Sequence, residues 1–328
     1  MTEIENREVE WEVLGLTVHG TITAPRRLAP GPGVILVAGS GPTDRNWCSP
    51  LLPGTNGSGR LLAELLAGKG FVTLRYDKLG SGPSARENAG KIAGRVSMRS
   101  HLEELTGAVR TLGAEPNVEP DKLFALTNSE GALHATNYEL GKSAMHFHSL
   151  IFTGAPGRSV GAVAREQLAE RGKDLPNLTE LLKRYDEAVG RFLAGAPAQP
   201  DPALPDGVRL LIRSLESPAN LPFARELWSY DLAARIGEIE RPVLVVIGKK
   251  DIQIDWNVDG GALENATAAR GLATFAYPAN ANHVLKHEET PKEELSGPMA
   301  GARYNAEDRE LDAECAGLIL QWLERRSQ

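Results

Sequence analysis

Apolar runs that alternate with amphipathic helical segments constrain the fold of this 328-residue chain more than any other feature. The runs "GVILVAG" (33–39), "FVTLRYD" (71–77) and "RPVLVVIG" (241–248) are largely apolar, as strands buried on both faces are. Helical spacing of apolar residues follows the first two runs, at 59–70 and 97–113. The alternation predicts an α/β fold, with a mostly parallel sheet and helices on both of its faces.

The two ends of the chain carry patterns of their own. Residues 7–25 read as two β-rich segments around Leu14-Gly15, which predicts an antiparallel hairpin at the start of the sheet. Helical spacing from about Ala306 to Arg326 predicts a helix that closes the chain.

The alternation is interrupted once, between residues 157 and 235. This segment has helix-like pieces and a Pro-rich joint, "GAPAQPDPALPDG", but no convincing strand. We therefore expect residues 1–156 and 236–328 to form one core, and 157–235 to form a helical cap inserted between two strands. Its larger apolar residues are expected either to line a substrate pocket or to form a small core of the cap: Leu178, Leu181, Leu182, Leu210, Leu211, Leu221, Phe223 and Trp228.

Composition excludes several classes of partner. The net charge of −7 gives no reason to expect nucleic acid or an acidic membrane as a partner, because both require a basic surface. Cys48 and Cys315 are far apart, which argues against a disulfide framework or a thiolate zinc site and fits a reducing compartment. The first residues lack the pattern of a signal peptide, and no apolar run could span a bilayer. We expect a cytoplasmic protein with no nucleic-acid or membrane partner, and a homo-oligomer is left open.

The stretch "LFALTNSEGALHA" places Ser129 between a strand and a helix. Serine is a favoured helix N-cap, so Ser129 could simply begin the helix. It could also be a nucleophile raised on a sharp strand-to-helix turn, which needs a small residue two positions later, and Gly131 meets that need. The same turn prefers glycine two positions earlier, where this chain has Thr127.

A serine nucleophile needs a base and an acid that orients the base, and both follow later strands. Asp251 comes directly after "VLVVIG", with Asp255 as a rival four residues on. His283 follows "LATFAYP" (272–278), with His287 as its rival. Because sites in parallel sheets form beyond the carboxyl ends of strands, Ser129, Asp251 and His283 are expected to meet there.

Five motifs resemble those of the α/β-hydrolase superfamily, in particular of bacterial serine esterases that carry a cap. They are "VAGSGPTDRN" (37–46), "RYDKLGSG" (75–82), "TNSEGA" (127–132), "GKKDIQI" (248–254) and "NHVLKH" (282–287), in this order. The resemblance implies that Ser129 is the nucleophile, His283 the general base and Asp251 its orienting acid. The chain departs from the pattern at Thr127 and at Ala38, where many relatives have histidine.

An oxyanion hole requires two backbone N–H groups aimed at the developing alkoxide. We expect one from Glu130, directly after the nucleophile, and one from Ser40 in the loop after residues 33–39. Gly39 and Gly41 would let that loop approach the substrate closely, and Trp228 is expected to contact the substrate from the cap.

Other polar residues near these motifs are given structural roles. Asp44 and Arg45 are predicted to brace their loop as a pair, and Asp77 to organise the turn after its strand. Surface or packing roles suit the remaining histidines: His19, His101, His134, His146 and His148.

A dinucleotide-binding fold is the main rival, because "VAGSGPTD" is Gly-rich and a later strand ends in an acid. The third glycine is missing, however, and a Pro-bearing loop delays the helix that should receive a pyrophosphate. No P-loop, H-E-x-x-H or cysteine cluster occurs, so neither a metal nor an organic cofactor is predicted. The sequence thus predicts a serine hydrolase of small carboxylic esters. Acyl transfer, peptide or C–C bond hydrolysis and ligand binding remain alternatives on the same fold, and a nucleotide-binding oxidoreductase is a remote one.

Overall fold

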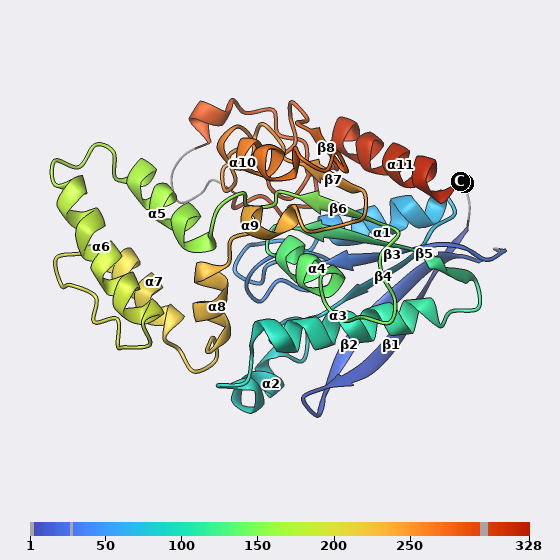
Figure 1. Ribbon diagram of the computed structural model, residues 1–328, viewed down its shortest axis with the longest axis horizontal. Coiled ribbons are helices and arrows are strands. Elements are labelled where there is room, and N and C mark those ends of the chain that lie inside the picture. The colour runs from blue at the N-terminus through green and yellow to red at the C-terminus, as the bar shows by residue number, and fades with distance from the viewer. Residues whose placement is uncertain (1–2, 27–28, 296–300) are drawn as a thin grey trace.

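A computed structural model describes residues 3–26, 29–295 and 301–328. Its centre is an eight-stranded sheet in the order β1-β2-β4-β3-β5-β6-β7-β8 (Figure 1). The strands are β1 (Ile4–Val13), β2 (Leu16–Pro25), β3 (Gly31–Val37), β4 (Val72–Tyr76), β5 (Val118–Asn128), β6 (Ser149–Thr153), β7 (Val243–Val246) and β8 (Ala273–Ala276). Strand β2 runs antiparallel to both of its neighbours, β1 and β4. The other six strands, in the order β4-β3-β5-β6-β7-β8, are parallel to one another.

Helices cover both faces of this sheet, which gives three layers. On one face, α1 (Ser58–Gly68) and α11 (Ala313–Ser327) share an apolar core with the central strands. On the other face, α3 (Met98–Gly113), α4 (Gly131–Glu139) and α10 (Val258–Thr267) share the larger core. Two short helices, α2 (Ala85–Ile92) and η1 (Lys292–Glu294), lie in connecting segments. The predicted α/β architecture is confirmed.

The two ends of the chain differ in how well their patterns predicted them. The N-terminal hairpin is present, and Leu14 and Gly15 form its turn with φ of 55° and 70°. The closing helix begins at Ala313 and not near Ala306. The Asp312 side chain sets this start, because it accepts a hydrogen bond from the Cys315 N–H at 2.9 Å and so caps the helix.

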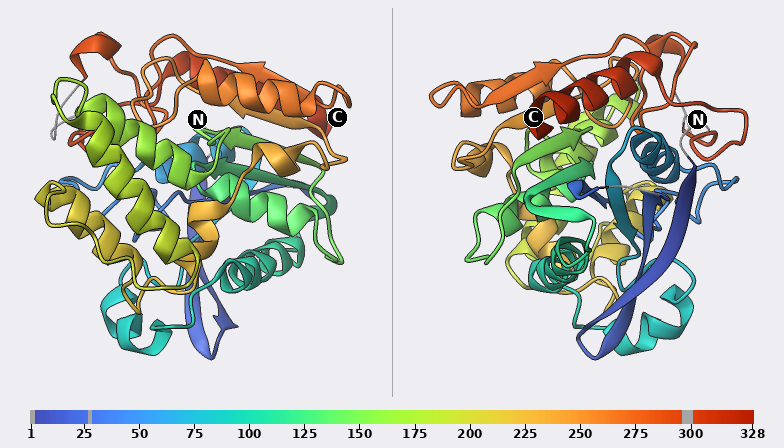
Figure 2. Two further views of the ribbon diagram at one scale, coloured as in Figure 1. Left: turned by 60° about the vertical axis from the view of Figure 1, so that its left-hand side comes forward. Right: turned by 90° about the vertical axis from the view of Figure 1, so that its right-hand side faces the viewer.

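Every residue between β6 and β7 is described, and none of them lies in a strand. This insertion holds α5 (Val160–Arg171), α6 (Leu178–Leu193), α7 (Asp206–Leu215), α8 (Phe223–Ser229) and α9 (Ala233–Ile236). Side chains of α5 to α8 enclose a third apolar core of their own. Figure 1 shows α5, α6 and α7 at one end of the molecule, opposite α11, and Figure 2 shows the same helices from two further sides.

The strand order places a crevice at one point of the sheet. The chain passes from β3 to β4 on one side and later enters β5 on the other side of β3. Such a reversal separates the loops that leave the two central strands, and ligands of open α/β sheets bind in the crevice beyond their carboxyl ends. The loop after β3 and the turn after β5 meet at this crevice, and they carry Ser40 and Ser129.

Candidate active site

Ser129 stands on a sharp turn between β5 and α4. Its φ of 53° lies in the left-handed region, which a residue with a Cβ rarely adopts and which costs about 1–3 kcal/mol. Its N–H donates to the Thr153 carbonyl at 2.8 Å, which holds the strained turn against β6. Glu130 occupies the N-cap of α4, so Ser129 is not an ordinary helix cap.

Small residues let the turn pack closely against β3. A Cβ on Gly131 would lie 2.6 Å from the Val37 carbonyl oxygen, closer than packed atoms approach. Thr127, at the departure from the hydrolase pattern, is fully buried, and its hydroxyl donates to the Ile151 carbonyl at 3.2 Å. A hydrogen bond to the neighbouring strand therefore accommodates this threonine.

The structure brings His283 and Asp251 together. His283 Nδ1 lies 2.8 Å from Asp251 Oδ2, and both side chains are buried. The second oxygen of Asp251 accepts the N–H groups of Gln253 and Ile254 at 2.8 and 3.0 Å. Three hydrogen bonds thus fix the carboxylate, and the carboxylate fixes the ring of the histidine.

Asn128 and Gly154 join this pair to the serine turn. Asn128, next to Ser129, donates to the His283 carbonyl at 2.9 Å. A Cβ on Gly154 would lie 3.2 Å from the ring of His283, so glycine leaves the room that the ring occupies. Sequence reasoning missed both residues, although each stands at the carboxyl end of a strand.

The two rival residues have partners elsewhere. His287 Nδ1 lies 2.9 Å from Asp312 Oδ2. Asp255 accepts from Lys292 at 3.2 Å and from the N–H groups at the start of α10. Neither rival contacts the pair of Asp251 and His283 through these bonds.

A cavity of about 130 Å³ opens beside Ser129. Its lining consists of Ser40, Ser129, Glu130, Pro156, Val160, Val163, Ala164, Gln167, Gln253 and Ile254. Ser40 and Glu130, the two expected oxyanion residues, thus share one cavity with Ser129. Gly39 packs against the turn, where a Cβ would lie 3.2 Å from that of Ser129, and Gly41 has a φ of 73°. The two glycines shape the loop but do not line the cavity.

Of the helices of the insertion, only α5 lines this cavity, and Pro156 lines it from the segment between β6 and α5. Because α5 follows β6 at the carboxyl edge of the sheet, it can share a cavity with Ser129. Trp228, expected to contact substrate, lies instead in the core of the insertion, where α8 packs on α5 and α6. The other seven apolar residues that could have lined a pocket do not line this cavity. Two of them, Leu210 and Leu211, are exposed.

The loop after β3 is braced differently from the prediction. Arg45 pairs with Asp77, whose carboxylate accepts the Arg45 N–H at 2.7 Å and its Nε at 2.9 Å. Asp44 does not pair with Arg45 and accepts the N–H groups of Asn46 and Cys48, both at 2.9 Å. Asp77 therefore joins the end of β4 to this loop, which is a larger role than organising its own turn.

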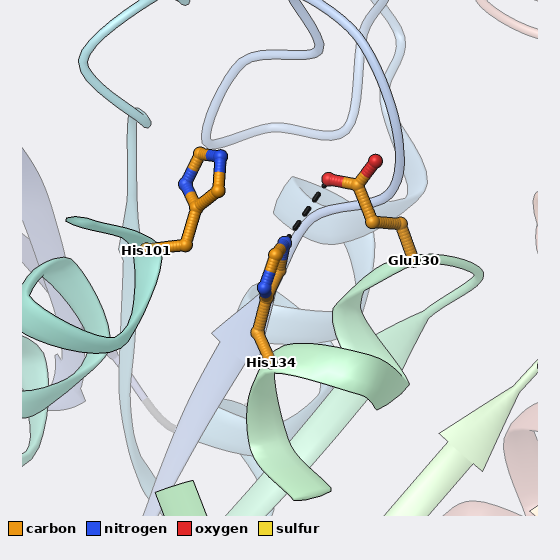
Figure 3. Close-up of side chains that lie close together, drawn as sticks. All are labelled: His101, Glu130 and His134. Carbon is orange, nitrogen blue, oxygen red and sulfur yellow. Dashed lines mark hydrogen bonds and ion pairs between the residues drawn. The ribbon is translucent and has the colours of Figure 1, made fainter. Parts of the chain in front are cut away.

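Behind the serine turn lies a buried charged network that sequence reasoning did not foresee. Glu130 Oε1 lies 3.0 Å from His134 Nε2 and 3.2 Å from Lys78 Nζ (Figure 3 shows Glu130, His134 and His101). Burial would raise the pKa of Glu130, but the Lys78 charge and the hydrogen bond to His134 outweigh it and hold that pKa well below its usual range. Burial lowers the pKa of His134 to about 4, which makes its ring neutral at pH 7 and a donor to Glu130 through Nε2.

Among the described residues, His101, Glu130 and His134 also form a group whose ligand atoms lie within 4.8 Å of one another. Such a composition can hold a metal ion. Here the Lys78 ammonium already neutralises the carboxylate and would repel a cation at the same oxygen. The group is therefore a buried charge network in which Lys78 and His134 both bond to Glu130.

The sequence of this chain is similar to that of a known esterase. No family model matches the sequence. It is 24% identical over 255 residues to Esterase EstD of Thermotoga maritima, a match that covers 74% of this chain and 53% of that protein. The chain thus spans about half the length of this curated relative.

Solved structures share the fold at low identity. The proline iminopeptidase of Mycobacterium smegmatis aligns with a TM-score of 0.58 at 13% identity, over 98% of this chain and 99% of that one. The α/β hydrolase GrgF of Penicillium sp. aligns with a TM-score of 0.57 at 16% identity, over the same shares of the two chains. The protein has the α/β-hydrolase fold, as its motifs predict. Within the described ranges, no helix is long and apolar enough to cross a membrane.

Proposed function

We propose that this protein is a serine hydrolase that cleaves carboxylic esters through an acyl-enzyme. One observation carries the proposal: the strained Ser129 opens onto the same cavity as Ser40 and Glu130, and its neighbour Asn128 bonds to the carbonyl of His283, which pairs with the buried Asp251. A nucleophile, an oriented base and two backbone donors are the parts that acyl transfer requires. The similarity to an esterase supports the same class of reaction.

The reaction runs in two halves. The Ser129 hydroxyl attacks the acyl carbon as His283 takes its proton, and the oxyanion accepts the N–H groups of Ser40 and Glu130. His283 returns that proton to the leaving alcohol, and the acyl group stays on Ser129. Water then attacks the acyl-enzyme with His283 again as the base, which releases the carboxylic acid. Asp251 accepts from His283 Nδ1 throughout and stabilises the imidazolium.

The cavity supports short acyl groups as substrates. Its volume of about 130 Å³ is close to that of an engineered apolar cavity of ~150 Å³ that binds benzene. Val160, Val163 and Ile254 make part of its wall apolar, so an acyl chain of about six carbons would fill it. We propose that the insertion acts as a cap, with α5 closing the acyl side of the site.

The test is release of p-nitrophenol from acetyl, butyryl, hexanoyl and decanoyl esters by the purified protein. Turnover is expected for the three shorter esters and should fall for decanoyl. Ser129→Ala should fold normally and lose about 10⁴-fold or more in kcat. No turnover by the wild type, or full activity of a folded Ser129→Ala variant, would contradict the proposal. A parallel assay with amino-acid p-nitroanilides distinguishes ester from peptide specificity.

A further inference from the structure

We infer that Lys78 is a positioning residue that aims both donors of the oxyanion hole. This inference rests on the proposed ester hydrolysis and assigns a role to a residue outside its triad. Lys78 is two residues beyond β4, and its side chain is only 6% exposed. Its Nζ donates to the Gly39 carbonyl at 2.6 Å and lies 3.2 Å from Glu130 Oε1. One ammonium group thus contacts both segments that supply a donor.

The contact with Gly39 fixes the direction of the Ser40 N–H. The Gly39–Ser40 peptide is trans, so its carbonyl and its N–H point in opposite directions within one plane. When Lys78 holds the Gly39 carbonyl on one side, the Ser40 N–H must face the other side, where Ser40 lines the cavity. A charged donor on the carbonyl also polarises the peptide, which makes its N–H a stronger donor to an oxyanion.

The contact with Glu130 holds the second donor. The N–H of Glu130 starts α4, and its side chain turns back into the core toward Lys78. The carboxylate is fully buried and takes its hydrogen bonds from Lys78 and His134 through a single oxygen, Oε1. Because a buried carboxylate needs a countercharge, Lys78 and Glu130 keep the two segments together. The spacing of the two donors is therefore set by the network and not by the loop after β3 alone.

Neutralisation of Glu130 alone does not explain why Lys78 also contacts Gly39. A lysine that served only to neutralise Glu130 would not need a 2.6 Å bond to Gly39, the residue before the oxyanion donor. Lys286 offers a comparison, since it is also fully buried and donates to a main-chain carbonyl, that of Asn56. That carbonyl lies in the segment before α1, and its peptide supplies no donor to the cavity.

The test compares Lys78→Met with the double variant Lys78→Met/Glu130→Gln and with Lys286→Met. Lys78→Met should lower kcat on p-nitrophenyl butyrate about 10²-fold, as loss of an oxyanion donor does, with KM changed less than threefold. Its affinity for a butylboronic acid, which forms a tetrahedral adduct at Ser129, should fall by a similar factor. Lys286→Met should keep kcat within a few-fold.

The double variant separates positioning from stability. It removes the unpaired buried carboxylate, so its thermal unfolding temperature should recover, while kcat and boronate affinity stay low because Gly39 has lost its donor. Recovery of kcat with stability, or wild-type kcat in Lys78→Met, would overturn the inference and leave the proposed hydrolysis intact. A wild-type protein without turnover or boronate binding would overturn both.

Discussion

Asp251 shows how a single side chain decides the chemistry at the residue scale. Its two oxygens take on different tasks: Oδ1 accepts two main-chain N–H groups, and Oδ2 faces His283 Nδ1 at 2.8 Å. The first set of bonds keeps the carboxylate still, and the second keeps the imidazole in the tautomer that a general base needs. Asp255, four residues on, accepts from Lys292 and from the start of α10 instead.

The two aspartates give a matched prediction. Asp251→Asn should lower kcat on p-nitrophenyl butyrate by about 10³–10⁴-fold, because an amide can no longer hold the required tautomer of His283. Asp255→Asn should stay within a few-fold of the wild type. Initial rates for both variants, with circular dichroism as the check on folding, measure the difference. Equal losses, or the opposite ranking, would show that Asp251 does not orient the base.

Gly131 gives a prediction about stability. A Cβ at this position would meet the Val37 carbonyl at 2.6 Å, so Gly131→Ala must push α4 away from β3. The free energy of unfolding in urea should fall by about 1–3 kcal/mol. Gly317→Ala is the control, because nothing lies within 4 Å of a Cβ in that helix, and it should gain roughly 0.5–1 kcal/mol. Equal effects of the two changes would show that the turn is not closely packed.

Among the helices of the insertion, α5 forms one wall of the cavity. It supplies Val160, Val163, Ala164 and Gln167 to the lining, whereas α6 and α7 supply none of it. The amphipathic helices α6 and α7 pack apolar side chains into the core of the insertion. The insertion therefore has two parts, a lining helix and a supporting layer.

This division predicts where substrate preference can be changed. Ala164→Leu would fill part of the cavity, so kcat/KM for hexanoyl ester should fall about tenfold or more relative to acetyl ester, since one or two methylenes are worth about 1–3 kcal/mol. Leu210→Ala, at an exposed position on α7, should leave the ratio unchanged. A series of p-nitrophenyl esters measures both ratios. An unchanged ratio in the Ala164→Leu variant would remove α5 from the acyl site.

Sequence patterns predicted the elements better than the lining of the site. The central strands were predictable because burial on both faces makes them largely apolar, and four of the five motifs follow such a strand. The start of α11 was not predictable in the same way. The residues before Asp312 have a composition typical of a helix but form turns, and the helix begins only after the Asp312 cap. Trp228 was misplaced because an apolar residue on a helix fits a helix core as well as a pocket wall. Lys78 was missed because periodicity gives no sign that a lysine is buried with its charge.

At the scale of the whole molecule, the buried network joins the core to the insertion. His101 on α3 and His134 on α4 pack against Phe223 on α8. The centroids of their rings lie 4.5 and 5.9 Å, respectively, from that of Phe223. His101 Nδ1 lies 2.7 Å from Glu104. The His101 ring also packs on that of His134, with centroids 4.6 Å apart, and His134 and Lys78 both bond to Glu130. The buried network therefore contacts both the turn after β5, through Glu130, and helix α8, through Phe223.

The network makes stability sensitive to acid. Folding lowers the pKa of His134 from 6.5 to about 4, so the folded state binds fewer protons than the unfolded chain between these values. The free energy of unfolding must therefore fall as the pH falls through this window, by at most about 1.4 kcal/mol per pH unit for one proton. His134→Gln removes the titrating ring beside Glu130, Lys78 and His101, and should flatten the slope by up to one proton. Urea unfolding between pH 4.5 and 6.5 measures how the free energy of unfolding depends on pH. Identical slopes for the wild type and His134→Gln would show that His134 does not cause this dependence.

Covalent capture of the nucleophile would identify the residue that attacks the ester. A fluorophosphonate reacts with an activated serine by losing fluoride, and intact mass followed by peptide mapping locates the adduct. A single adduct is predicted on Ser129, with loss of esterase activity in step with labelling, no labelling of Ser129→Ala and slower labelling of Asp251→Asn. An adduct on another residue, or ester hydrolysis that continues with Ser129 fully modified, would contradict the account.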